Sequence, residues 1–145
     1  MALYQKIILA LDLHPECDLT LIDKAKQFAQ LFNAELIIAH AVEKIYSYGI
    51  SQAYPGMINI EDELLAAAKT ELAKLCVSSG IAQSKQVVCA GSPKLVLFTL
   101  AEEEQADLII VGSHGRHGLE LLLGSTANSI LHSARCDVLA IRLKD

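Results

Sequence analysis

The sequence predicts an α/β fold, a single-domain three-layer sandwich in which helices cover both faces of a five-stranded parallel sheet. Five short runs of aliphatic and β-branched residues recur along the 145 residues. Most of these runs are apolar on both faces, which is typical of parallel strands buried beneath helices. Between them, apolar residues recur at three- and four-residue steps, as on one face of a helix. The alternation predicts parallel strands joined by right-handed crossovers.

Five strands and four helices are expected in alternation. The strands are Lys6–Leu13, Glu35–Val42, Lys85–Ala90, Asp107–Ser113 and Asp137–Leu143. The first helix has an apolar face formed by Leu19, Ile22, Ala25, Ala29 and Phe32. The second begins at the acidic stretch "NIEDE" with Asn59 as its N-cap, and its apolar face is formed by Ile60, Leu64, Ala68, Leu72 and Leu75.

The third helix opens with Ser92 as its cap and Pro93 at its first position. The fourth begins near Ser125 or Thr126 and ends before Cys136. The connection from Glu43 to Asn59, "EKIYSYGISQAYPGMIN", is long for a compact domain. It is either a functional loop or flap or an inert surface excursion whose tyrosines pack locally.

Composition limits the function classes. A chain with 52% apolar and 20% charged residues is globular and long enough to bury a core, so one domain over residues 1–145 is expected. A net charge of -5 argues against a broad nucleic-acid-binding face. The four cysteines show no zinc-finger or disulfide-scaffold spacing, which favours a reducing cytoplasm. The run "KIILALDL" is short and carries Asp12, so neither a signal peptide nor a membrane span is expected.

A glycine-rich segment after the fourth strand, "VGSHGRHGLELLLGSTANS", predicts an anion site. Glycines at 112, 115, 118 and 124 let the backbone turn and approach a bound group closely. Gly124, Ser125 and Thr126 lie where a helix begins, and its free N–H groups favour phosphate. Arg116 adds positive charge. The alternative, tight packing with helix capping, requires only one glycine and one serine.

Asp12 is the second candidate, because it is the only charge within an apolar strand. If the first and fourth strands are neighbours, their carboxyl ends bring Asp12 and Gly112 together at the point where ligands of open α/β sheets bind. There the carboxylate can accept hydrogen bonds from ribose hydroxyls. Alternatively, it caps nearby backbone N–H groups.

Other catalytic and metal motifs are not supported. The Walker, Rossmann and nucleophile-elbow patterns are absent from the sequence. His114 and His117 lack a third metal ligand at a recognisable spacing, and nothing fixes a Ser113–His114–Asp12 triad. His40, at the end of the second strand, is interpreted as a satisfied, partly buried histidine. No catalytic or metal-binding residue is therefore assigned.

The stretches "KIILALDL", "ELIIAHAVE" and "VGSHGRHGLELLLGSTANSILHSARCDVLAIRL" resemble the universal stress protein family over essentially the whole chain. The resemblance implies an adenine nucleotide alpha hydrolase-like fold, with four helices and a parallel sheet of strand order 3-2-1-4-5. It also implies cytoplasmic homodimers and, in one branch of the family, binding of ATP or AMP.

That branch carries Gly, two residues, Gly, nine residues and then Gly followed by Ser or Thr. Gly112, Gly115 and Gly124-Ser125 match these positions, but the second spacing is one residue short, and Gly118 is where the connector can rearrange. The nucleotide-binding residues that the resemblance implies are Ala10, Leu11, Asp12, Ala41, Val111, Gly112, His114, Gly115, Arg116, Gly124, Ser125 and Thr126. Asp12 would contact the nucleoside, Ala41 and Val111 the adenine, and the glycine segment the phosphates.

The last strand is expected at an edge of the sheet, where exposed apolar backbone invites pairing with a second copy. The expected dimer interface is Val138, Leu139, Ala140, Ile141 and Arg142. The alternative is an edge protected by Arg142 and Lys144.

The favoured function is a dimeric stress-response or signalling module that binds AMP or ATP, with or without Mg²⁺, and has no obligatory cofactor. Unidentified proteins are the expected partners, and nucleic acid and membranes are not. The alternatives are a nucleotide-independent dimeric interaction protein and a slow ATPase. The sequence offers no clear general base and no acidic pair for Mg²⁺ near the loop, which argues against turnover.

Overall fold

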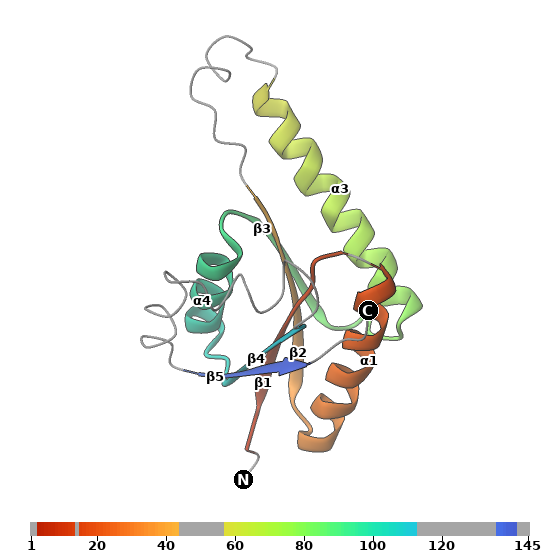
Figure 1. Ribbon diagram of the computed structural model, residues 1–145, viewed down its shortest axis with the longest axis vertical. Helices are drawn as coiled ribbons and strands as arrows, with labels where there is room; N and C mark the ends of the chain where they lie inside the picture. The colour runs from red at the N-terminus through yellow and green to blue at the C-terminus, as the bar shows by residue number, and fades with distance from the viewer. Residues whose placement is uncertain (1–2, 14, 44–56, 113–135, 142–145) are drawn as a thin grey trace.

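The structure, a computed structural model, describes residues 3–13, 15–43, 57–112 and 136–141 (Figure 1). Its elements in chain order are β1 Lys6–Ala10, α1 Pro15–Phe32, β2 Glu35–Val42, α3 Met57–Ser78, β3 Lys85–Ala90, α4 Pro93–Glu104, β4 Leu108–Gly112 and β5 Asp137–Ile141. The fourth expected helix falls in 113–135, outside the described residues.

The strands form one parallel sheet of order β3-β2-β1-β4-β5, which confirms the predicted topology. The central strand is β1, in which Ile8 lies opposite Ile37 of β2 and Ile109 of β4. The chain runs outward from β1 through β2 to β3 and then crosses to β4 and β5. The strand order therefore reverses between β1 and β4.

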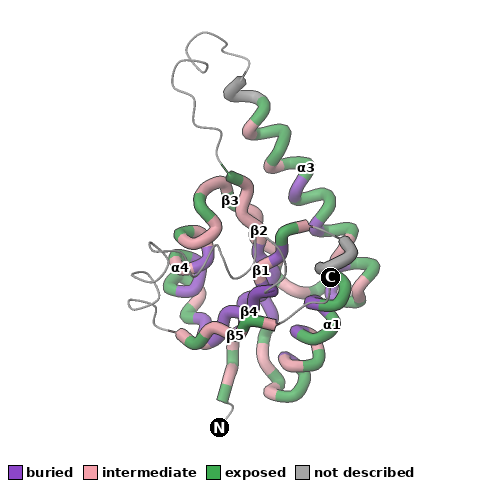
Figure 2. Tube along the Cα trace, in the orientation of Figure 1, coloured by how far each residue is buried: buried purple, intermediate pink, exposed green. Residues whose placement is uncertain are grey.

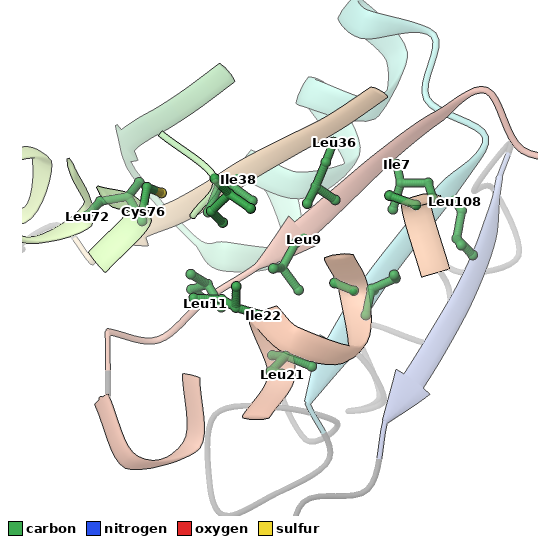
Figure 3. Packing of buried hydrophobic residues seen from close by; sticks show 14 residues of the cluster. Ile7, Leu9, Leu11, Leu21, Ile22, Leu36, Ile38, Leu72, Cys76 and Leu108 are labelled. Carbon is green, nitrogen blue, oxygen red and sulfur yellow. The ribbon is translucent and has the colours of Figure 1, made fainter. Parts of the chain in front are cut away.

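Helices α1 and α3 cover one face of the sheet, and α4 covers the other (Figure 1). Ile7 and Leu9 belong to the first core cluster, whereas Ile8 belongs to the second. Figure 3 shows Leu9, Leu11 and Ile22 gathered between β1 and α1. Because side chains alternate along a strand, both faces of β1 must be apolar, and each fully buried aliphatic side chain contributes about 1.5–3 kcal/mol.

The buried faces of the helices differ in part from the predicted ones. In α1, Leu19 is exposed and Leu21 is buried instead, because the face that meets the sheet is centred on Ile22 and Ala25. In α3, Ile60 and Leu64 are exposed because the first turns of the helix extend beyond the end of the sheet (Figures 1 and 2).

Several predicted boundaries also need correction. Helix α3 begins at Met57, so Asn59 lies inside the helix and is not its N-cap. Strand β1 ends at Ala10 rather than Leu13, because Leu13 has a φ of 61°, which a strand cannot contain. Ser92 and Pro93 open α4 as predicted, but the Ser92 side chain makes no capping hydrogen bond.

The thiols of Cys76, Cys89 and Cys136 are free. Among the described residues, no helix has the length and apolar character needed to cross a membrane.

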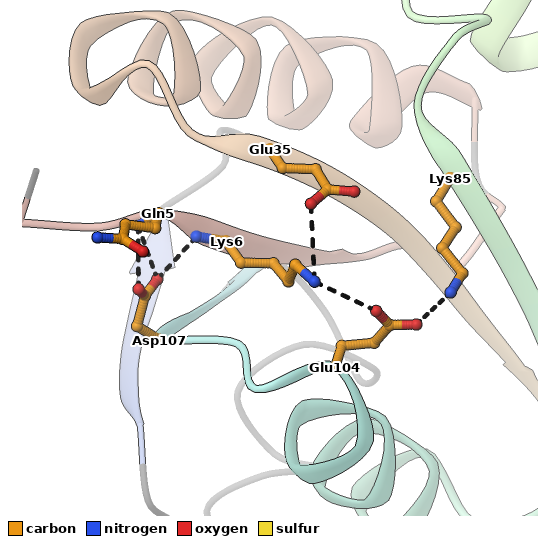
Figure 4. Close-up of polar contacts among 6 residues, drawn as sticks. All are labelled: Gln5, Lys6, Glu35, Lys85, Glu104 and Asp107. Atoms are coloured by element: carbon orange, nitrogen blue, oxygen red, sulfur yellow. Dashed lines mark hydrogen bonds and ion pairs between the residues drawn. The ribbon is translucent and has the colours of Figure 1, made fainter.

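Charged side chains join the amino ends of the strands on the α4 side (Figure 4). The Nζ atom of Lys6 lies 3.7 Å from Glu35 Oε2 and 3.5 Å from Glu104 Oε2. Lys85 forms an ion pair with the same Glu104 carboxylate. The network therefore links β1, β2 and β3 to the last turn of α4.

Asp107 fastens β1 to β4 at the same end of the sheet. Its carboxylate accepts hydrogen bonds from the backbone N–H of Gln5 at 3.0 Å and of Lys6 at 3.1 Å. Its own N–H donates to the Lys6 carbonyl at 3.0 Å. Next to it, the Tyr4 hydroxyl donates to Asp137 at 2.8 Å, which raises the pKa of Tyr4.

The Glu104 network makes stability depend on pH. The hydrogen bond from Lys85 lowers the pKa of the Glu104 carboxyl, with Lys6 adding to the effect. A lowered pKa contributes stability above the ordinary carboxyl value and loses it as pH falls through the folded-state value. Glu104→Gln should therefore lower the urea midpoint near neutral pH, and its difference from the wild type should vanish in acid. The exposed Glu63→Gln is the control; a deficit that persists unchanged in acid would contradict the assignment.

Candidate functional site

The carboxyl ends of β1 and β4 lie side by side at the point where the strand order reverses. Leu9 pairs with Ile110, so the register carries Leu11 to the level of Gly112. On the far side of β4, Gly112 pairs with Ile141 of β5. Crevices for ligands of open α/β sheets form at such reversal points. The structure thus brings the β1 end and the start of the glycine-rich segment together, as predicted.

Asp12 lies two residues beyond β1 and is exposed. Both of its chain neighbours make contacts with the rest of the fold. Leu11 is buried, and its N–H donates to the Ala39 carbonyl at 2.9 Å. Leu13 is partly buried and packs against the first core cluster. An exposed carboxylate keeps its contact with water, in contrast to one within a buried strand. The position explains how the sheet tolerates this charge.

The carboxyl end of β2 lies on the other side of β1. Ala39 pairs with Ala10, which brings Ala41 level with Asp12. Ala10 and Ala41 are both half-buried, whereas Val111 of β4 is buried. Small side chains therefore lie at the ends of β1 and β2, next to the end of β4.

Six of the twelve predicted nucleotide-binding residues lie in the described part of the chain. They are at the carboxyl end of the sheet: Ala10, Leu11, Asp12, Ala41, Val111 and Gly112. The remaining six, His114, Gly115, Arg116, Gly124, Ser125 and Thr126, lie outside the described residues. Gly118, His117 and Arg142 also fall there. Within the described ranges, no group of three or more His, Cys, Asp and Glu side chains is arranged to hold a metal ion.

Two features of this region were not predicted as parts of the site. His40 is partly buried, as expected, and its Nδ1 lies 2.7 Å from the Leu11 carbonyl oxygen. The sequence indicated a histidine at the end of a strand, but it did not indicate that the Leu11 carbonyl is its hydrogen-bond partner. Leu13 has the left-handed conformation, which a leucine rarely adopts, so no sequence signal indicates it.

The backbone of Gly91 ties the end of β3 to β2. The Gly91 N–H donates to the Val42 carbonyl at 2.8 Å, immediately before α4 begins. Its φ is 140°, a value that residues with a Cβ rarely adopt. This glycine fixes where the chain leaves the carboxyl end of the sheet for α4.

Comparisons with known proteins agree with this architecture. The model of the Universal stress protein family matches residues 3–142. Universal stress protein A homolog 2 of Coxiella burnetii is 44% identical over 141 residues, covering 97% of both chains. Homolog 1 of the same organism is 39% identical, covering 98% of this chain and 99% of its own.

Two solved structures share the fold. The structure of MJ0577, a universal stress protein of Methanocaldococcus jannaschii, superposes with a TM-score of 0.72 at 25% identity and 98% coverage of both chains. A crystal structure of a universal stress protein in complex with cAMP has a TM-score of 0.63 at 26% identity, covering 95% of this chain and 96% of its own.

We expect Gly91→Ala to lower the free energy of unfolding by about 1–3 kcal/mol. The left-handed backbone is costly for alanine, and its Cβ would lie 3.3 Å from Cγ2 of Val96. Urea unfolding of Gly91→Ala, Val96→Ala and the double variant separates the two effects. The double variant should recover the part due to the Val96 contact and keep the backbone part. If Gly91→Ala is as stable as the wild type, the backbone at position 91 relaxes without cost and the prediction is wrong.

Proposed function

The chain belongs to the universal stress protein family, and from this premise we propose that it binds an adenine nucleotide, AMP or ATP, between the carboxyl ends of β1 and β4. In this proposal it is a dimeric cytoplasmic module of stress response or signalling. Nucleotide occupancy changes the surface that partner proteins contact, at the segment from Tyr46 to Tyr54 or at the dimer.

One observation carries the proposal: the exposed Asp12 and the start of the glycine-rich segment at Gly112 meet where the strand order reverses. A carboxylate at that point suits ribose hydroxyls, and glycine amides suit phosphate. The structural relative solved with cAMP, which is itself an adenine nucleotide, supports the same ligand class.

The proposed site divides the ligand between two parts of the chain. Asp12 accepts from the ribose, and the backbone at Ala10, Leu11, Ala41 and Val111 surrounds the base. The amides of Gly112, Gly115 and Gly124 hold the phosphates, together with His114, Arg116, Ser125 and Thr126. Each hydrogen bond to a charged phosphate oxygen is worth about 1.5–3 kcal/mol. When the ligand is ATP, Mg²⁺ binds together with its phosphates.

Calorimetric titration with AMP, ADP and ATP tests the proposal. At a hundredfold excess over Kd, the nucleotide should stabilise the fold by about 2.7 kcal/mol and raise its melting temperature. Asp12→Ala should weaken binding about tenfold or more, because the ribose loses a charged acceptor. Gly115→Val should abolish it by blocking approach to the backbone.

The exposed Asp62→Ala on α3 is the matched control and should bind like the wild type. Absence of heat and of a melting shift with all three nucleotides would favour the nucleotide-independent dimeric protein. Phosphate release that Asp12→Ala abolishes would instead support a slow ATPase.

The dimer rests on β5, which lies at the end of the strand order and pairs with β4. Val138, Leu139 and Ile141 are half-buried and Ala140 is exposed. A strand of this composition at a sheet edge is a template for another strand. Two copies related by a two-fold axis can pair these edges antiparallel and close the assembly, with Arg142 at the end of the interface.

Ala140→Asp should convert the dimer to a monomer in sedimentation velocity, because pairing would bring two like charges together at the shared edge. Leu95→Asp is the control: it places the same charge on an exposed site in the first turn of α4, where acidic residues are favourable. A monomeric wild type, or a dimer that tolerates Ala140→Asp, would rule out β5 as the interface.

A further inference from the structure

We infer that His40 is a positioning residue for the proposed site at the carboxyl ends of β1 and β4: its ring fixes the Leu11–Asp12 peptide group, and thereby the position of Asp12. The inference deepens the proposed function, on which its binding readout rests. It also makes a separate claim about the protein without ligand.

The tautomer of His40 follows from its contact. Nδ1 lies 2.7 Å from the Leu11 carbonyl oxygen, and a carbonyl oxygen can only accept a hydrogen bond. Nδ1 must therefore carry the proton. In the neutral ring this leaves Nε2 as the acceptor, the reverse of the tautomer that predominates in free histidine. His40 is thus held in the less common form by the end of β1.

The same contact sets the orientation of the next peptide group. The Leu11 N–H donates to Ala39 of β2, and the Leu11 carbonyl accepts from His40 of β2, so both groups point toward that strand. In a planar trans peptide the carbonyl and the following N–H point in opposite directions. The Asp12 N–H is therefore directed away from β2, toward the side of β1 on which β4 lies. The peptide group that carries Asp12 is thereby held in one orientation at the end of β1.

A fixed orientation matters because regular pairing has ended here. β1 stops at Ala10, and Leu13 already has a φ of 61°. Between them, rotation of the Leu11–Asp12 peptide would turn its carbonyl toward β4 and displace Asp12. The His40 hydrogen bond opposes that rotation. If only a fraction of molecules holds the competent orientation, the apparent affinity falls by that fraction.

Two substitutions of similar size distinguish this role from packing. Asparagine can present an amide N–H near the position of Nδ1, whereas leucine has no donor. If His40 only fills space, His40→Leu should disturb the structure and AMP binding less than His40→Asn, because leucine is apolar. If His40 positions the peptide, His40→Asn should disturb them less than His40→Leu.

The experiment combines NMR of the protein without ligand and calorimetry with AMP. We expect ¹⁵N spectra to show His40 protonated at Nδ1. The Asp12 amide resonance should move in His40→Leu and return toward its original position in His40→Asn. Binding of AMP should weaken about five- to tenfold in His40→Leu and stay within about twofold of the wild type in His40→Asn.

A proton on Nε2 with none on Nδ1, or a leucine variant that binds AMP as tightly as the wild type, would overturn the inference. If the wild type binds no adenine nucleotide at millimolar concentration, the proposed function fails. The spectra of the protein without ligand then test the role of His40. A proton on Nδ1, with an Asp12 amide resonance that His40→Asn restores, supports this role. An Asp12 amide resonance that neither substitution shifts refutes it.

Discussion

The parallel pairing of β1 with β4 is the constraint on which the rest of the molecule depends. Both strands are buried on both faces, so a shift of one residue would exchange one set of aliphatic side chains for another. In a sheet with one polar face such a shift is strongly penalised, but here polarity alone cannot set the register. Asp107 supplies the missing specificity, because it binds the backbone of Gln5 and Lys6 where the two strands begin.

The two ends of the sheet are held together by different kinds of contact. At the amino ends, Lys6, Lys85 and Glu104 join strands and helix through their side chains. The Lys85–Glu104 contact raises the pKa of Lys85 and lowers the pKa of Glu104, and both shifts favour folding. At the carboxyl ends, the described contacts include backbone hydrogen bonds from Leu11 to Ala39 and from Gly91 to Val42. The register fixed at one end is thereby transmitted through rigid strands to the other, where it aligns Leu11 with Gly112.

The sequence predicted β2 and β3 to the residue, because both are apolar runs bounded by polar residues. It made β1 three residues too long, because the left-handed conformation of Leu13 has no composition signal. Helical periodicity identified the residues that share a face of α3 but not how far the sheet extends beneath them, so Ile60 was wrongly expected to be buried. For the candidate site, the sequence indicated Asp12 and Gly112, and the strand pairing places them at neighbouring strand ends. The contact between His40 and Leu11 could not be predicted, because it depends on the register of two strands.

The sign of the charges determines how a nucleotide would lie in the proposed site. In the proposed site Asp12 would accept hydrogen bonds, and its negative charge would repel phosphate. It would therefore favour the ribose, whose hydroxyls are donors, on the side next to β2. The phosphates would then extend over β4 toward the glycine-rich segment, to which the proposal assigns the amides and Arg116 as the complementary charge. His40 would contribute without touching the phosphates, because its hydrogen bond to the Leu11 carbonyl fixes the peptide group that carries Asp12. A site organised in this way would bind the nucleotide in one orientation, and that orientation would originate in the pairing of β1 with β4.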